Sequence, residues 1–361
     1  MAEIASVVNP DVPTWSDIFT DLLHGYDLDP LVTTWAMNQI MNDAASAVQM
    51  AGFLVAMRAK GETPAEVNGL VEAMLAHAKL IDIPGHAVDV VGTGGDRSNS
   101  VNISTMAAIA VAGTGAHVVK HGNRAASSAC GSADLLEALG IDLSLTPDAV
   151  EAVGKSVGIT FCFAPIFHPS MRFVGPTRKE LGIPTIFNIL GPLSNPAQPT
   201  ASAVGCGDLR RARLIADVFA HRQSTALVFR GDDGLDEITT TTTTQVWRVH
   251  GGTVTEDSLS PQRLGLTPAS PTDLLGGDPA VNAAIARDVF AGKTGPVRDV
   301  VVANAAAALV ALEMSKADAG ASWPKLEDAF VEAMDQVRVS LDGGGAASVL
   351  QAWVAATVAK A

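Results

Sequence analysis

Apolar residues recur every three or four positions through much of the first eighty residues, which is the pattern of helices that bury one face. This spacing predicts helices over residues 15–23, 29–59 and 64–81. Thr63-Pro64 places a proline at the first position of the third helix, where proline is well tolerated. No strand pattern precedes residue 88, so the sequence begins with a small helical domain.

From residue 88 onward, short β-branched runs alternate with helical patterns, as in crossover units of a parallel sheet. The runs predict strands over residues 88–91, 116–119, 159–163, 225–229, 239–245 and 247–249. The helical patterns cover residues 103–112, 132–139, 174–181, 279–291, 300–315 and 325–339, and residues 186–190 fit neither pattern clearly. The threonine run 239–244 is assigned to a strand rather than a linker because threonine favours half-buried strands.

These elements predict an α/β protein with two domains. Residues 1–86 form a small N-terminal helical domain, joined by helices near residues 174–192. Residues 87–361 form a large α/β domain with a central, mostly parallel sheet flanked by helices. A length of 361 residues suits two domains of roughly 150 residues each or somewhat more.

Composition narrows the class of protein. The longest apolar stretch, residues 300–312, is interrupted by Asn304 and is shorter than the roughly 20 residues that span a bilayer. The first residues lack the basic start and apolar core of a leader, so we expect a cytoplasmic protein with no membrane partner. The net charge of −14, without a basic run, argues against a nucleic-acid partner. Cys130, Cys162 and Cys206 are widely spaced and are expected to be reduced thiols.

Two glycine-rich segments carry the candidate chemistry, residues 89–96 and residues 120–128. Each follows an apolar run and opens into a helical pattern, which is where open α/β sheets place ligands. Gly92, Gly94 and Gly95 lack the β-carbons that would stop successive backbone N–H groups from turning toward an anion. The second segment supplies lysine, asparagine, arginine and serine donors. A phosphate-rich substrate fits both segments.

Two further groups of polar residues follow predicted strands. The residues Ser100 to Thr105 open the helix over 103–112, whose positive end favours an anion, although serine and threonine also serve as simple helix caps. Asp236-Glu237 follow a strand and a turn, and paired carboxylates of this kind suit magnesium. A merely acidic loop is the alternative for that pair.

In their order along the chain these motifs resemble the anthranilate phosphoribosyltransferases. The resemblance rests on Gly92-Thr-Gly-Gly-Asp96, Asn102-Ile-Ser-Thr105, Lys120-His-Gly-Asn-Arg124, Gly131-Ser-Ala-Asp134, His168-Pro169, Arg178 to Pro184, Asn188 to Pro196 and Asp236-Glu237. It extends over nearly the whole chain. The family usually has a glycine after Gly-Gly-Asp, whereas this chain has Arg97, which leaves the shape of the loop tip open.

The resemblance implies transfer of a 5-phosphoribosyl group from phosphoribosyl pyrophosphate to the amine of anthranilate, with release of pyrophosphate, in tryptophan biosynthesis. It also implies Mg²⁺ as cofactor and a homodimer. Such a reaction needs no covalent nucleophile. No residue is therefore assigned covalent chemistry, and catalysis is expected to rest on positioning and electrostatics.

The resemblance also implies three sets of site residues. Those for phosphoribosyl pyrophosphate are Gly92, Thr93, Gly94, Gly95, Asp96, Ser100, Asn102, Ile103, Ser104, Thr105, Lys120, Asn123, Arg124, Ser127, Ser128 and Ser132. Those for anthranilate are Gly92, His121, Asn123, His168, Met171 and Arg178, with Arg178 meeting the carboxylate and His168 and Met171 near the entrance. Those for the metal are Ser104, Asp236 and Glu237.

Two other functions remain open at this point. A pyrimidine nucleoside phosphorylase has a related fold with a glycine loop and a lysine-led second motif, but Asn123-Arg124 together with Arg178 favour anthranilate. A non-catalytic relative that binds nucleic acid would need a basic groove and would have no use for Asp236-Glu237.

Overall fold

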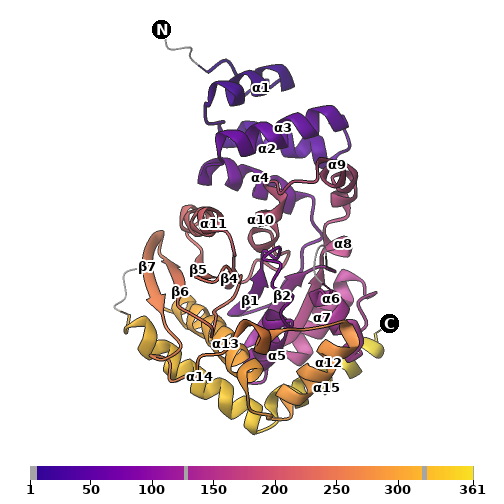
Figure 1. Cartoon of the computed structure of the whole chain (residues 1–361). Coiled ribbons are helices and arrows are strands. Elements are labelled where there is room, and N and C mark those ends of the chain that lie inside the picture. Colours follow the sequence, from indigo (N-terminus) through magenta and orange to yellow (C-terminus); the bar gives the residue numbers. More distant parts are fainter. Residues whose placement is uncertain (1–5, 126–128, 319–322, 361) are drawn as a thin grey trace.

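The computed structural model describes residues 6–125, 129–318 and 323–360. A helical bundle from the N-terminal part of the chain stands above a larger body in which helices surround a sheet (Figure 1). This arrangement confirms the predicted α/β class with a small helical part.

The bundle contains four helices where three were predicted. They are α1 (Trp15–His24), α2 (Pro30–Met41), α3 (Ala47–Lys60) and α4 (Pro64–Ala76). The single helix predicted over residues 29–59 is wrong, because the chain turns at Asn42 and Asp43, the latter in the left-handed region at φ 57°. Ser46 and Gln49 then form a capping box that begins α3. The apolar spacing continues across the break because both helices face one core.

The third helix is also shorter than the predicted 64–81. It ends at Ala76. The His77 and Ala78 N–H groups still donate to carbonyls of its last turn, and the chain then bonds to distant segments. Lys79 N–H donates to the Phe167 carbonyl and Ile81 N–H to the Pro196 carbonyl. Residues 77–86 therefore form an extended connection into the sheet.

Two later helices pack with the bundle, α9 (Gly175–Leu181) against α3 and α10 (Phe187–Leu193) against α4. Val174 and Leu190 belong to the same apolar core as Phe53. Residues 186–190, ambiguous in the sequence, are therefore mostly helical. The division of the chain at residue 86 stays a prediction.

The sheet has seven strands in the order β3-β2-β1-β4-β5-β6-β7. They are β1 (Ala87–Gly92), β2 (His117–Gly122), β3 (Ile159–Phe163), β4 (Ala201–Gly205), β5 (Thr225–Gly231), β6 (Thr244–His250) and β7 (Thr253–Leu259). The first five in this order pair in parallel, and β6 and β7 are antiparallel. The sheet is thus mostly parallel, as predicted.

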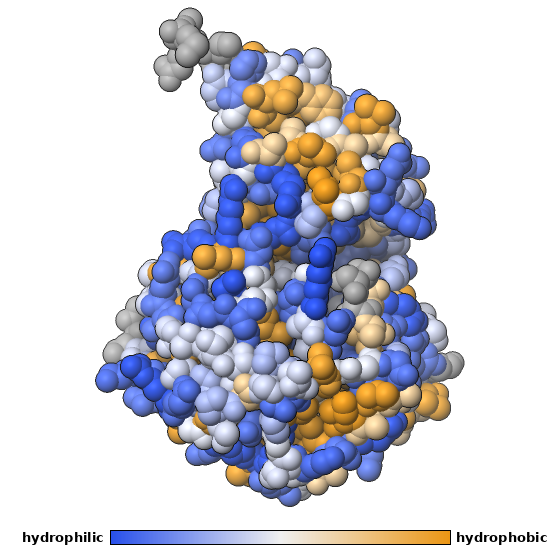
Figure 2. Space-filling view, in the orientation of Figure 1, coloured by the Kyte–Doolittle hydropathy of each residue, from blue (hydrophilic) through white to orange (hydrophobic). Residues whose placement is uncertain are grey.

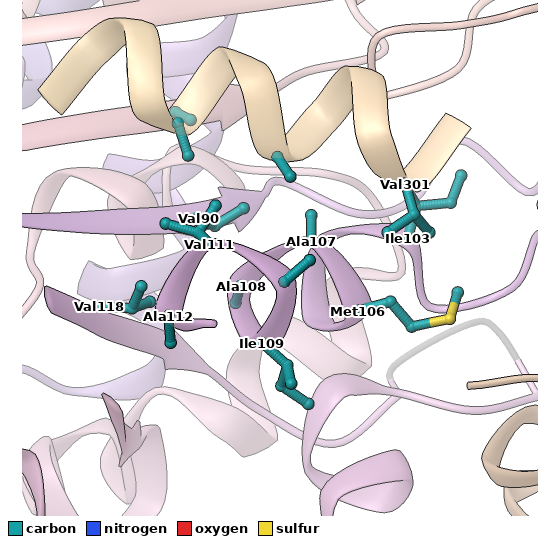
Figure 3. Packing of buried hydrophobic residues seen from close by; sticks show 14 of the residues in the cluster. Val90, Ile103, Met106, Ala107, Ala108, Ile109, Val111, Ala112, Val118 and Val301 are labelled. Atoms are coloured by element: carbon teal, nitrogen blue, oxygen red, sulfur yellow. The ribbon is translucent and has the colours of Figure 1, made fainter. Parts of the chain in front are cut away.

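Helices cover both faces of the sheet, and strand residues alternate between two cores. In β5, Leu227 and Phe229 belong to the core that includes α13 (Pro296–Ser315), whereas Ala226 and Val228 belong to the core that includes α11 (Leu209–His221). This alternation is the period of two expected for a strand buried on both faces. Figure 3 shows α13 passing over α5 (Ile103–Ala112), with Val301 beside Ile103.

The remaining helices complete the larger body. They are α6 (Ser132–Leu139), α7 (Pro147–Val157), α8 (Ala164–Phe167), α12 (Pro279–Phe290), α14 (Leu326–Asp342), α15 (Gly345–Val358) and the short 3₁₀ helices η1 (Pro169–Phe173) and η2 (Pro271–Leu274). Within the described part of the chain, no helix combines the length and apolarity that a membrane span requires. The three cysteines are buried and form no disulfide.

The threonine run is not the predicted strand. Residues 240–242 form a bend, residues 239 and 243 have no regular structure, and β6 begins only at Thr244. The hydroxyls of Thr239 and Thr241 donate to the Asp233 carboxylate, and that of Thr243 donates to Asp232. These side-chain bonds replace ladder bonds and hold the run as a loop.

Candidate active site

The candidate site is a pocket at the carboxyl ends of β1 and β2, lined mainly by residues 91–104, 120–125 and 130–132. Of the predicted residues, those that line it are Gly92, Thr93, Gly94, Gly95, Asp96, Ser100, Asn102, Ile103, Ser104, Lys120, His121, Asn123, Arg124, Ser132, Arg178, Asp236 and Glu237. Segments that are far apart in the sequence therefore meet around one space.

Five predicted residues do not appear in the lining. Thr105 is buried, because one further step along α5 turns its side chain away from the pocket that Ser104 faces. His168 is buried behind His121, and Met171 packs against the bundle core. His168 and Met171 were predicted to lie near the entrance, and neither of them lines the pocket. Ser127 and Ser128 lie outside the described residues.

The glycine loop has the conformation that its composition predicts. Gly94 and Gly95 have φ of 66° and 82°, a region that residues with side chains rarely adopt. The Gly94 N–H donates to Asp236 Oδ2 at 2.7 Å, so the loop is fastened to the carboxylate pair. The loop tip contains two non-glycine residues in the same region, Arg97 at φ 60° and Asn99 at φ 52°. Arg97 thus adopts the backbone conformation that a glycine would favour.

The start of α5 is bound by residues from outside the helix. Asn102, its N-cap residue, makes no side-chain capping bond, and its amide donates instead to the Cys130 carbonyl at 2.9 Å. Glu237 Oε1 accepts the Ser104 N–H at 3.1 Å. The capping explanation for Ser100 to Thr105 is therefore wrong for Asn102, whose side chain instead joins separate segments of the pocket wall.

Lys120 lies inside β2 rather than after it, because the strand continues to Gly122. Its side chain is almost fully buried, and its ammonium group donates to the Val90 carbonyl and, at 3.3 Å, to Ser104 Oγ. Burial lowers the pKa of Lys120, while the negative charges of Asp89 and the carboxylate pair act in the opposite direction. The lysine joins both sides of the pocket floor.

The negative charge of Asp89 acts on Lys120, and the sequence analysis did not name Asp89 as a site residue. It is fully buried, accepts the His121 N–H at 3.1 Å, and accepts from Asn195 Nδ2 at 2.8 Å. Burial raises the pKa of Asp89 to about 6, against the opposing effects of Lys120 and these hydrogen bonds. Asn195 also donates to the Val119 carbonyl, which ties the closing turn of the Asn188 to Pro196 motif to β2.

Asp236 and Glu237 face the pocket from the segment after β5. Burial and the neighbouring Asp96 carboxylate raise the pKa of Asp236 to about 7. Burial and the Asp236 charge raise the pKa of Glu237 well above its ordinary value. Several carboxylates close together in a dehydrated wall repel one another, which favours a cation between them.

The donor set fits Mg²⁺ on its chemistry. Asp236 and Glu237 each use one oxygen on a backbone N–H, so each keeps a second oxygen for a cation. The described residues contain no group of three or more His, Cys, Asp or Glu side chains placed to hold a metal by itself. A cation here therefore needs oxygens from substrate or water, which is the usual situation for Mg²⁺ at phosphates.

Arg124 lines the pocket, but its guanidinium is held by α6. It donates to Asp134 Oδ1 at 3.0 Å and to both carboxylate oxygens of Glu137 at 2.5 and 2.8 Å. It also lies over the Phe163 ring at 5.5 Å. These contacts hold the loop after β2 against the following helix.

Arg178 is a further cation that lines the pocket. It projects from α9, lies over the Phe187 ring at 5.6 Å, and donates to Asn188 Oδ1 at 3.4 Å. Burial lowers the pKa of Arg178, since its charge is partly removed from water. Since the described residues give this guanidinium one long hydrogen bond, it retains donors for an anionic ligand.

His121 and His168 form a pair with ring centroids 5.1 Å apart. His121 Nδ1 contacts the Gly191 carbonyl at 3.0 Å, and His168 Nε2 contacts the Ser194 carbonyl at 3.1 Å, so these nitrogens carry the hydrogens. The other nitrogen of each ring is buried without a partner among the described residues. Burial lowers the pKa of His121 to about 3, with a contribution from His168, and lowers the pKa of His168 to about 4. Both rings are therefore neutral at pH 7.

Sequence reasoning missed part of the lining. The additional residues are Val91, Arg97, Ser98, Asn99, Val101, Gly122, Ala125, Cys130, Gly131 and Asn188. Most of these residues lie inside the recognised motifs or next to them. The motifs therefore indicated their positions, but the predicted site included too few residues of each motif. Cys130, expected only to be a reduced thiol, is buried and also borders the pocket.

Comparison with known proteins covers both parts of the chain. Residues 16–78 match the family model described as "Glycosyl transferase family, helical bundle domain". Residues 84–346 match the one described as "Glycosyl transferase family, a/b domain".

The similar proteins share one description. The anthranilate phosphoribosyltransferase of Saccharopolyspora erythraea is 52% identical over 94% of this chain and 95% of its own length. The crystal structure of the Thermus thermophilus enzyme is similar with a TM-score of 0.86 and 36% identity, over 94% of this chain and 99% of that one. The Saccharomyces cerevisiae enzyme in complex with PRPP and Mg is similar with a TM-score of 0.84 and 27% identity, over 96% and 98% of the two chains.

Proposed function

The chain belongs to the glycosyl transferase family with a helical bundle domain and an a/b domain, and from this we infer that it is an anthranilate phosphoribosyltransferase. It transfers the 5-phosphoribosyl group of phosphoribosyl pyrophosphate to the amine of anthranilate. The anomeric C–O bond to pyrophosphate breaks, a C–N bond forms, and the amine loses a proton. Neither alternative function finds support among these relatives.

One observation carries this proposal. The glycine loop, the start of α5, Lys120 and the carboxylate pair face a single pocket, and Arg178 faces the same pocket from α9. A glycine loop suited to an anion and a separate guanidinium therefore border one space. This is the arrangement that a reaction between a pyrophosphate ester and an aromatic acid requires.

The anion side binds phosphoribosyl pyrophosphate. The left-handed backbone at Gly94 and Gly95 and the positive end of α5 favour its phosphates, and Lys120 adds a cation at the floor. Asp236 and Glu237, with the Ser104 hydroxyl, hold Mg²⁺. When bound, Mg²⁺ supplies positive charge that stabilises the departing pyrophosphate.

The other wall binds anthranilate. Arg178 pairs with its carboxylate, and Asn188 keeps that guanidinium in place. His121, which borders the pocket, is neutral and adds no charge of its own beside the substrate. Holding both substrates in one orientation supplies much of the rate enhancement without a covalent intermediate.

The proposal includes a homodimer and a cytoplasmic location. Hydrophobic residues gather over the helical bundle in Figure 2, and Leu23, Val48 and Val55 on α1 and α3 are exposed. An apolar face of this kind on a helical bundle suits a second copy of the chain. Light scattering coupled to gel filtration tests the dimer, and a mass near that of one chain would contradict it.

The function is tested by following anthranilate fluorescence with the purified protein, phosphoribosyl pyrophosphate and Mg²⁺. We expect the signal to fall only when all components are present, and mass spectrometry to find the phosphoribosylated amine. Thymidine with inorganic phosphate is the comparison reaction. Turnover of thymidine with a stable anthranilate signal would overturn the proposal in favour of a nucleoside phosphorylase.

A further inference from the structure

Asn304 is a buried amide in an otherwise apolar helix. It lies in the middle of α13, and every other residue from Val300 to Leu312 is alanine, valine or leucine. Its side chain is fully buried. Burying an amide is costly unless its hydrogen-bonding groups are satisfied, so this residue must have partners that an alanine or leucine would not provide.

The partners are backbone groups of a single distant residue and of its own helix. Asn304 Oδ1 accepts the Ile238 N–H at 2.8 Å, and Nδ2 donates to the Ile238 carbonyl at 2.9 Å. Nδ2 also donates to the Val300 carbonyl at 2.8 Å. Ile238 lies between β5 and β6, where the chain has left the sheet. The Asn304 amide thus makes with the Ile238 backbone the two hydrogen bonds that a neighbouring strand would otherwise make.

This contact fixes the backbone next to the carboxylate pair. The peptide between Glu237 and Ile238 is planar, so a bond at the Ile238 N–H also fixes the orientation of the Glu237 carbonyl and Cα. On the pocket side the Glu237 carboxylate accepts from Ser104 and the Asp236 carboxylate accepts from Gly94. The pair is thus held from the front by the glycine loop and α5, and from behind by Asn304.

Such a rear contact matters because the two carboxylates are adjacent and buried. Like charges in a dehydrated wall push each other apart, and a loop held only by its front contacts would relax. We propose that Asn304 is a positioning residue that holds the Asp236-Glu237 segment in the geometry that binds magnesium with phosphoribosyl pyrophosphate. This inference rests on the metal assignment of the proposed function.

The test compares two substitutions in one helix. Asn304→Ala removes the contact and leaves room for a water to satisfy Ile238, so the chain is expected to fold. Met314→Ala, at a fully buried position ten residues further along α13, is the control for loss of packing. Calorimetry measures phosphoribosyl pyrophosphate affinity with Mg²⁺ and with EDTA. Hydrogen exchange measures opening at the Ile238 amide.

We expect Asn304→Ala to reduce the gain in affinity that Mg²⁺ provides by about tenfold, as outer contacts of metal ligands typically do. Exchange at Ile238 should accelerate in the same variant. Met314→Ala should leave the gain in affinity from Mg²⁺ and the exchange rate at Ile238 within about twofold of the parent values. Equal effects in the two variants, or an unchanged Mg²⁺ gain in Asn304→Ala, would overturn the positioning role. If the parent protein binds phosphoribosyl pyrophosphate equally well with Mg²⁺ and with EDTA, the metal assignment is wrong instead.

Discussion

Gly92 and Asp236 lie so close together that a β-carbon at position 92 would be 2.7 Å from Asp236 Oδ2. The same carboxylate oxygen accepts the Gly94 N–H. The first glycine of the loop is therefore needed less for backbone freedom than for space, since its φ is not in the left-handed region. The loop and the carboxylate pair depend on each other for their positions.

Gly92→Ala is expected to turn the Asp236 carboxylate aside while leaving the fold intact, because the atom that must move is the end of a side chain. We expect kcat/KM for phosphoribosyl pyrophosphate to fall about tenfold or more, with a change in unfolding free energy below about 1 kcal/mol. Gly175→Ala, where nothing lies within 4 Å of the added carbon, is the control. Kinetics and thermal unfolding of both variants check this, and equal activities would contradict it.

Asp236→Asn combined with Glu237→Gln should abolish turnover and raise the melting temperature. Burial raises the pKa of both groups, with Asp96 adding to the rise at Asp236 and Asp236 to the rise at Glu237, so their ionised forms oppose folding at pH 7. Amides of the same shape remove this repulsion together with the charge that a metal needs. Calorimetric unfolding and the anthranilate assay measure the two effects. A double variant with parental rates would remove the metal assignment.

Several elements with clear patterns were predicted within a residue or two, but the amphipathic helices α7 and α11 were not predicted, nor were elements that neighbours impose. The helix over 103–112 and the strand over 159–163 have the predicted limits, since buried Ala, Ile and Val or aromatic residues mark them clearly. β4 was missed because Ala201 to Gly205 is mostly alanine, serine and glycine, residues of low strand propensity. Its conformation comes from pairing with β1 and β5.

In the site, motifs identified most of the lining but not how its parts are held. Arg124 looked like a donor for the substrate, and only the fold shows that Glu137 and Asp134 occupy its guanidinium. Asn304 looked like a flaw in an apolar stretch, because nothing local indicates a partner 66 residues away. Contacts between distant segments depend on topology, which residue spacing along one segment does not encode.

His121→Gln should cost stability at neutral pH and progressively less in acid. The pKa of His121 is about 3 in the folded protein and near 6.5 when exposed, so the unfolded chain binds the proton first. The stability that the neutral ring contributes is complete above pH 6.5 and is lost as the pH falls from 6.5 toward 3. The difference in unfolding free energy between parent and variant should shrink by about 1.4 kcal/mol per pH unit in that window.

The measurement is chemical denaturation at pH 7.5, 6.0 and 5.0, where other groups titrate alike in parent and variant. NMR of the imidazole carbons gives an independent readout, in which the His121 and His168 signals should stay at neutral-ring shifts down to pH 5. A constant difference in unfolding free energy, with a His121 signal that titrates near pH 6.5, would show that the ring is open to water.

Arg178→Ala should raise the KM for anthranilate about tenfold to a hundredfold and leave the KM for phosphoribosyl pyrophosphate within about twofold, because a charged hydrogen bond is worth about 1.5–3 kcal/mol. Arg172→Ala is a matched control, since Arg172 also lies over a phenylalanine ring but does not line the pocket. Steady-state kinetics with each substrate varied in turn measures the two KM values separately. If Arg178→Ala and Arg172→Ala change the anthranilate KM equally, the effect comes from packing on the bundle, and the aromatic carboxylate must bind elsewhere.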